Sequence, residues 1–221
     1  MILHIAGVLS AIETAALTEL ISDASLFTDG RGTAGWRARE RKSNLQADAD
    51  APLVAGALRK IETALTEHEV FQAAARPKSI VGLLLSRYEP GMGYGTHVDE
   101  ALIADQRTDL AFTLFLCTPN SYGGGELVIA RTEGDRGFKL PAGDLLLYPA
   151  TTLHRVAPVT RGVRLAAVGW VRSLVRDAGQ RELLFDLDQA IELLRGGSDA
   201  ERALDLVLKA RGNLLRRWIE D

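Results

Sequence analysis

Two stretches in the first third of the chain repeat apolar residues at the three-to-four-residue spacing of an amphipathic helix. The first follows Ser10 and Glu13, whose S-x-x-E spacing is that of a capping box, and it predicts a helix over residues 11–24. The second predicts a helix over residues 52–67. Between them, residues 28–50 are rich in glycine and arginine, which indicates a loop with one irregular strand.

From residue 78 the pattern changes to short apolar runs that Gly, Pro, Asn and Asp separate. Many short strands at close spacing are typical of a β-sandwich or barrel. No helix-length pattern interrupts them, which argues against a doubly wound parallel sheet. The predicted strands are Ser79–Tyr88, Leu110–Thr118, Glu126–Ala130, Gly137–Leu140, Asp144–Tyr148, Arg155–Val159 and Arg164–Arg172.

After residue 173 the helical spacing returns and predicts a C-terminal helical hairpin. Gly196-Gly197 ends its first helix, and the capping box Ser198–Glu201 begins the second. The hairpin could cover the barrel or form a homo-oligomer interface. We therefore divide the chain into an N-terminal helical and loop segment that packs on the core (1–77), a β core (78–176) and a C-terminal helical region (177–221).

Composition narrows the classes of function. The 221 residues are 47% hydrophobic and 25% charged, which is typical of a globular protein. A net charge of −3 argues against general binding to nucleic acid. No stretch approaches the roughly 20 apolar residues of a membrane span, and the single cysteine, Cys117, cannot form an internal disulfide. We expect a soluble cytoplasmic protein with no membrane or nucleic-acid partner.

Three side chains suggest a metal site. His97 and Asp99 are two residues apart, so in an extended chain they point to the same side with Cα atoms ~6.5 Å apart. This pair alone is weak evidence. His154, just past the apolar run ending at Tyr148, supplies a third ligand, because an ionisable group at such a position needs a partner or a function. Two histidines and one carboxylate form the facial triad of non-haem Fe(II) oxygenases, which leaves three coordination positions open. We expect the other histidines, His4 and His68, to be structural and solvated, respectively.

Arg164 adds a site for a carboxylate. It opens the apolar run that ends at Trp170, ten residues after His154, and a strand, turn and returning strand can bring it back beside the metal. A guanidinium binds a carboxylate through two parallel hydrogen bonds. A 2-oxo acid could thus be held at one end by the metal and at the other by Arg164, although a surface strand arginine is the alternative interpretation.

The motifs around these residues resemble a known family. The segment from Arg87-Tyr88 to His97-Val98-Asp99 is similar to the R-Y-x-x-G-x-x-Y-x-x-H-x-D signature of prolyl and lysyl hydroxylase-like Fe(II)/2-oxoglutarate dioxygenases. His154 to Arg164 resembles their second motif, H-x-V-x-P-V-x-x-G-x-R. Gly124 to Leu127 resembles the turn between the motifs, and Val175 to Asp188 resembles the bacterial PKHD-type subgroup.

The resemblance implies a mainly β fold with flanking helices around a double-stranded β-helix, or jelly-roll, core. It implies that Tyr88 binds 2-oxoglutarate and that Tyr94 and Trp170 lie near the substrate, although strand and core packing are alternative roles for Tyr88 and Trp170. Asn44 and Gln46 resemble a subgroup segment that faces the pocket, with turn chemistry as the simpler alternative.

The resemblance further implies Fe(II), 2-oxoglutarate as co-substrate and ascorbate as reductant, with succinate and CO₂ released as a C–H bond is hydroxylated. It also suggests a link to iron uptake. The motifs do not identify the substrate, although the basic loop Arg31–Lys42 could contact an acidic substrate. Two alternatives stay open: a cupin-like isomerase or hydrolase, which needs the metal but not Arg164, and a non-catalytic barrel that senses or stores a ligand.

Overall fold

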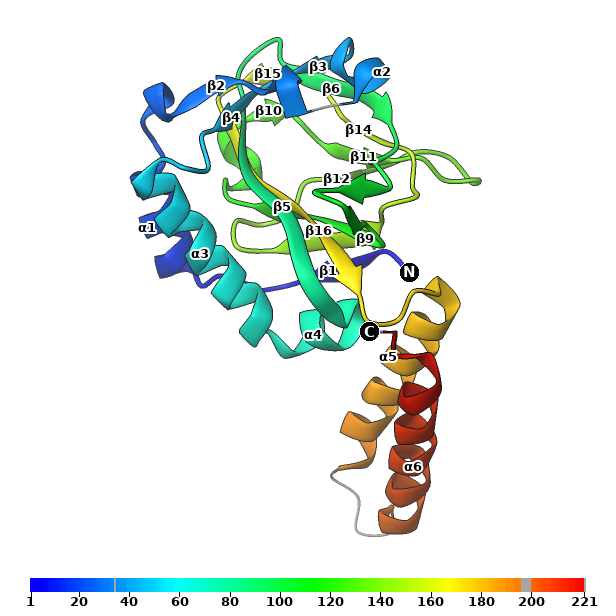
Figure 1. Ribbon diagram of the computed structural model, residues 1–221. Helices are drawn as coiled ribbons and strands as arrows, with labels where there is room; N and C mark the ends of the chain where they lie inside the picture. The colour runs from blue at the N-terminus through cyan, green and yellow to red at the C-terminus, as the bar shows by residue number, and fades with distance from the viewer. Residues whose placement is uncertain (34, 196–199, 221) are drawn as a thin grey trace.

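Two antiparallel sheets face each other in the computed structural model, which describes residues 1–33, 35–195 and 200–220 (Figure 1). The larger sheet has seven strands. In spatial order they are β1 (Leu3–Ile5), β13 (Leu145–Pro149), β9 (Leu110–Phe115), β16 (Arg164–Ser173), β5 (Pro77–Tyr88), β4 (Leu45–Ala47) and β2 (Phe27–Asp29).

The smaller sheet has five strands and closes the other side of the core. They are β12 (Arg136–Phe138), β11 (Leu127–Ile129), β14 (His154–Val156), β6 (Gly93–His97) and β3 (Lys42–Ser43). Two short ribbons, β10 (Gly123–Gly124) with β15 (Val159–Arg161) and β7 (Leu102–Ile103) with β8 (Gln106–Arg107), complete the β structure of the described residues. The arrangement is a jelly roll, as the family resemblance implied.

Alternation along β9 explains the layers of the core. Every residue of β9 is buried, because the sheet is covered on both faces. Phe112 and Leu114 pack against the helical layer, whereas Ala111 and Phe115 face the interior between the sheets. The period of two therefore makes each central strand a wall of the interior on one side and a support for helices on the other.

Helices cover the outer face of the larger sheet. They are α1 (Ala11–Leu20), α3 (Pro52–Glu67) and α4 (Glu69–Ala75), and a single turn, α2 (Trp36–Arg39), lies near β3 (Figure 1). The capping box of Ser10 and Glu13 is present, although α1 ends at Leu20 rather than at residue 24. The described part of segment 28–50 holds the end of β2, the strands β3 and β4, a 3-10 turn (Gly30–Thr33) and α2, rather than one irregular strand, and its strands join both sheets.

The C-terminal hairpin of α5 (Ala178–Leu194) and α6 (Glu201–Trp218) extends away from the sheets (Figure 1). Asp188 anchors it, because its carboxylate pairs with Arg76 at the end of α4 and with Arg211 of α6. The predicted cap residue Ser198 lies outside the described residues. None of the helices in the described ranges combines the length and the apolar content needed to cross a bilayer.

Candidate functional site

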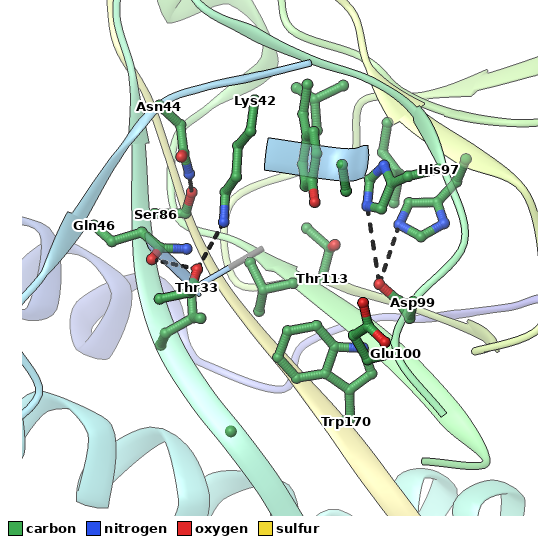
Figure 2. A pocket seen from close by; sticks show the side chains of 18 of the residues that line it. Thr33, Lys42, Asn44, Gln46, Ser86, His97, Asp99, Glu100, Thr113 and Trp170 are labelled. Atoms are coloured by element: carbon green, nitrogen blue, oxygen red, sulfur yellow. Dashed lines mark hydrogen bonds and ion pairs between the residues drawn. The ribbon is translucent and has the colours of Figure 1, made fainter. Parts of the chain in front are cut away.

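Strand pairing brings the three predicted metal ligands together. His97 is the last residue of β6, and His154, the first residue of β14, lies directly opposite it in the register of these strands. Asp99 follows two residues after β6 ends. Its Oδ1 lies 3.9 Å from Nε2 of His97 and 3.7 Å from Nε2 of His154 (Figure 2). One ligand atom from each residue falls within 4.8 Å of the others, so the group could hold a single metal ion.

Backbone carbonyls orient both histidine rings. Nδ1 of His97 lies 2.9 Å from the carbonyl oxygen of Gly95, and Nδ1 of His154 lies 2.9 Å from that of Thr152. A carbonyl only accepts, so Nδ1 carries the proton in each ring and Nε2 turns its lone pair toward Asp99. Such partners are typical of metal-binding histidines, since they fix the tautomer and the ring orientation.

Burial also favours a cation here. It lowers the pKa of His97 to about 3, and the nearby His154 adds to the effect, so His97 stays in the neutral form that coordinates metals. Burial raises the pKa of Asp99, although His154 and Trp170 oppose the rise. Oδ2 of Asp99 is buried and has no hydrogen-bond partner among the described residues. A bound cation would compensate both the buried carboxylate and its unpaired oxygen.

Arg164 is buried, and no carboxylate among residues 1–33, 35–195 and 200–220 forms an ion pair with it. It begins β16 opposite Tyr88 of β5, is only 2% exposed, and lies over the Tyr88 and Phe115 rings at 5.1 and 5.6 Å. No ion pair of Arg164 is present in the described part of the chain, and its Nε and the nearby Tyr122 hydroxyl are buried without partners. A buried guanidinium in an aromatic setting is strongly unfavourable unless an anion joins it. This site therefore fits one carboxylate of 2-oxoglutarate.

A bulge in β5 makes room for Trp170. Gly82 has a φ of +63°, and the register between β5 and β16 shifts between Val168 and Trp170. A Cβ at Gly82 would lie 3.1 Å from the indole, so this position combines a left-handed backbone with close contact to the ring. Trp170 thereby lines the pocket beside Asp99 (Figure 2).

The other predicted pocket residues also line this cavity. Tyr94 stacks on His97 with ring centroids 3.7 Å apart and planes at 19°. Asn44 and Gln46 are both buried, and Nδ2 of Asn44 donates to Oγ of Ser86 at 2.7 Å. The turn chemistry considered for Asn44 and Gln46 does not describe them, since both belong to or adjoin β4 inside the pocket.

The sequence placed Lys42 at the end of a basic loop but did not predict that it is a buried cation on the same wall. Lys42 is 7% exposed, donates from Nζ to Oγ1 of Thr33 at 2.8 Å, and lies 5.2 Å from the centre of the Tyr94 ring. Burial lowers its pKa to about 8. A signal was available, because Lys42, Asn44 and Gln46 alternate and so point to one side of an extended segment.

Comparisons with known proteins agree with this geometry. The model of the 2OG-Fe(II) oxygenase superfamily matches residues 83–172, and that of the PKHD-type hydroxylase C-terminal domain matches residues 178–220. A PKHD-type hydroxylase of Synechococcus sp. (strain JA-2-3B'a(2-13)) is 51% identical, and one of Maricaulis maris is 48% identical, each over 100% of both chains.

A solved structure shares the fold. The Pseudomonas putida prolyl-4-hydroxylase aligns with a TM-score of 0.55 at 22% identity, over 78% of this chain and 92% of that one. The solved structure shows only the fold, whereas the similarity to the curated relatives spans the full length of this chain and therefore assigns its family. The chain belongs to the PKHD-type hydroxylases, a family of 2OG-Fe(II) oxygenases.

Proposed function

We propose that the enzyme hydroxylates a C–H bond of its substrate while 2-oxoglutarate and O₂ are converted to succinate and CO₂. His97, Asp99 and His154 would hold Fe(II), which supplies the oxidising chemistry when bound with 2-oxoglutarate and O₂. The observation that carries the proposal is that this three-ligand group shares one cavity with a buried Arg164 that has no ion pair among the described residues.

Arg164 and Tyr88, with Phe115 beside Arg164, form the part of the cavity that binds 2-oxoglutarate. The guanidinium of Arg164 binds the distal carboxylate of 2-oxoglutarate, and the Tyr88 hydroxyl donates to the same group. Burial raises the pKa of Tyr88, against the opposing effect of Arg164, so its hydroxyl keeps the proton it donates. Phe115 and the Tyr88 ring exclude water from around the guanidinium, which strengthens the ionic contact.

The substrate side is formed by Tyr94, Trp170, Asn44 and Gln46. Tyr94 holds His97 in place by stacking on its ring, and Trp170 lies beside Asp99 in the cavity (Figure 2). Asn44 and Gln46 supply amide groups from β4 on the other wall. These positions orient a C–H bond toward the triad.

Both alternatives are less consistent with the cavity. A cupin-like isomerase or hydrolase requires the metal ligands but has no use for a buried arginine among aromatic rings. A non-catalytic barrel would not require three ligands with open coordination positions. Burying Arg164 without a protein carboxylate is costly, which favours a function that needs an anionic co-substrate.

The test is succinate formation from 2-oxoglutarate by the purified enzyme with added Fe(II) and no other substrate. We expect slow, O₂-dependent succinate release from wild type and its loss in His97→Ala. Arg164→Met should retain stoichiometric metal and lose turnover at low 2-oxoglutarate. Arg172→Met, on the same strand, is the matched control and should behave as wild type. Absence of succinate from the metal-loaded wild type would reject the proposal.

Further aspects rest on the family resemblance and are proposed with it. Ascorbate would maintain the reduced metal, the enzyme would act in the cytoplasm without nucleic acid, and its product would serve iron uptake. Growth of a deletion strain under iron limitation tests the iron link.

The C-terminal helices would pair two copies of the chain, since α6 buries no residue and Leu193 of α5 is 85% exposed. A change of molecular mass in Leu193→Lys tests the interface.

A further inference from the structure

The wall of the cavity formed by β3 and β4 carries a buried cation that the reaction described above does not use. Lys42 can donate three hydrogen bonds, but Oγ1 of Thr33 is the acceptor found for it among the described residues. Figure 2 shows its ammonium group pointing into the space between this wall and the metal ligands. Two donor positions therefore face the cavity.

No carboxylate of the described chain pairs with Lys42. Asp29 and Asp99 favour its charged form electrostatically, yet neither forms an ion pair with it. A buried ammonium without a counter-ion is unfavourable, and proteins retain such a group where a ligand supplies the charge. Arg164 shows the same property on the other sheet.

Gln46 adds a second donor. The Thr33 hydroxyl lies 2.8 Å from Oε1 of Gln46, which fixes the amide with its oxygen toward Thr33. Nε2 of Gln46 has no acceptor in the described part of the structure, and Figure 2 shows it on the cavity side. Thr33 thus orients both groups, and an ammonium and an amide N–H are presented together.

Two neighbouring donors, one of them charged, match the two oxygens of a carboxylate. A phosphate dianion would call for more than one cation, and among the described residues that line this wall Lys42 is the one cation. The subsite is also separate from Arg164 in the fold, because Lys42 and Gln46 stand on β3 and β4, whereas Arg164 begins β16, and β5 lies between β4 and β16 in the larger sheet. The cavity would therefore hold 2-oxoglutarate and the substrate together, each through a carboxylate site of its own.

We infer that Lys42 and Gln46, oriented by Thr33, bind a carboxylate of the substrate that is hydroxylated. This inference rests on the proposed function, in which Arg164 binds 2-oxoglutarate. The substrate class is then a molecule with a free carboxylate, either a small acid or the C-terminus of a peptide. Its reactive C–H bond lies on the side of the molecule that faces His97 and Asp99.

The test is calorimetric binding to enzyme loaded with 2-oxoglutarate and Ni(II), which occupies the metal site without turnover. The probes are acetate, N-acetylproline and a tripeptide ending in proline, each compared with its neutral amide. We expect at least one carboxylate to bind wild type tenfold or more tightly than its amide. The probe that binds best separates a small acid from a peptide C-terminus.

Two variants locate the effect. Lys42→Met should reduce the preference for carboxylate to less than twofold and leave 2-oxoglutarate affinity within twofold of wild type. Gln46→Glu, which conserves shape and gives Lys42 an internal carboxylate, should also abolish the preference. Lys139→Met is the control, because Lys139 likewise lies over a tyrosine ring and has one backbone acceptor but lies outside the cavity.

Equal binding of acids and amides to wild type, or no binding of any acid, would overturn the inference. So would an unchanged preference in Lys42→Met or Gln46→Glu. Succinate formation by the same wild-type preparation with Fe(II) distinguishes failure of the carboxylate subsite from failure of the proposed function. If succinate forms while the carboxylate preference is absent, only the subsite is wrong, whereas absence of succinate removes the proposed function.

Discussion

Replacing Lys42 with methionine should stabilise the protein when metal and substrates are absent. Wild type holds an ammonium group in a buried wall, where burial lowers its pKa from 10.5 to about 8 despite the favourable charges of Asp29 and Asp99. Methionine fills similar space without a charge. The Lys42 ammonium therefore lowers the stability of the free enzyme, and we expect it to be useful only when substrate is bound.

The magnitude follows from the pKa. The interval from 10.5 to about 8 corresponds to roughly 3 kcal/mol of unfavourable charge burial at pH 7. Methionine gives up the hydrogen bond from Nζ to Thr33 and the contact with the Tyr94 ring, each worth about 1 kcal/mol or less. The variant should gain about 1–2 kcal/mol in free energy of unfolding.

The sign of the pH dependence is fixed by the same pKa. Between pH 8 and 10.5 the unfolded chain binds more protons at Lys42 than the folded protein does, so wild-type stability rises with pH relative to the variant. The advantage of Lys42→Met should thus be full below pH 8. It should fall to within about 1 kcal/mol of zero at pH 10, where most of the burial cost is gone.

Urea denaturation with a chelator present, at pH 7 and at pH 10, measures both effects. Lys139→Met serves as the control, since it loses a 2.7 Å hydrogen bond to the Tyr122 carbonyl and should not gain stability at either pH. Loss of stability in Lys42→Met at pH 7, or a gain that is the same at both pH values, would refute the reasoning.

Three further predictions concern charged groups. Arg164→Met should raise the KM for 2-oxoglutarate about 100-fold or more, because two charge-assisted hydrogen bonds are lost. Steady-state assays of succinate formation measure this KM, and an unchanged value would contradict the role of Arg164. Asp99→Ala should abolish stoichiometric metal binding in calorimetry, and retained binding would show that Asp99 is no ligand. Asp188→Asn should lower the free energy of unfolding by about 2–4 kcal/mol, since Arg76 and Arg211 lose their shared carboxylate, and a urea midpoint equal to that of wild type would contradict this.

The strands that carry the candidate site could be predicted because their patterns are local. The apolar run after Arg164 and the run ending at Tyr148 became β16 and β13, and the capping box of Ser10 is present. A buried strand between turn residues is visible in the sequence itself, and so is an ionisable residue at its end. The positions of His154 and Arg164 followed from those two patterns.

Elements that depend on distant partners could not be predicted. The strands β3 and β4 have two and three residues and exist because β6 and β5 pair with them. The burial of Lys42 follows from that pairing, so its role was hidden in a loop rich in charge. Helix α4 was missed because it is short and follows α3 directly, and His68, expected on the surface as a solvated side chain, caps it by accepting from the Phe71 N–H.

The cross-strand position of His97 and His154 makes the candidate metal site depend on the register of β6 and β14. The two rings meet only in the correct register of β6 and β14, and a slip of one residue would turn one ring to the opposite face of the sheet. If these residues hold the metal, a chain with the wrong register would lack a complete ligand set and would not retain a reactive metal. Iron loading would then select correctly folded molecules, and an error in strand pairing would produce an inert protein rather than a source of uncontrolled oxidation.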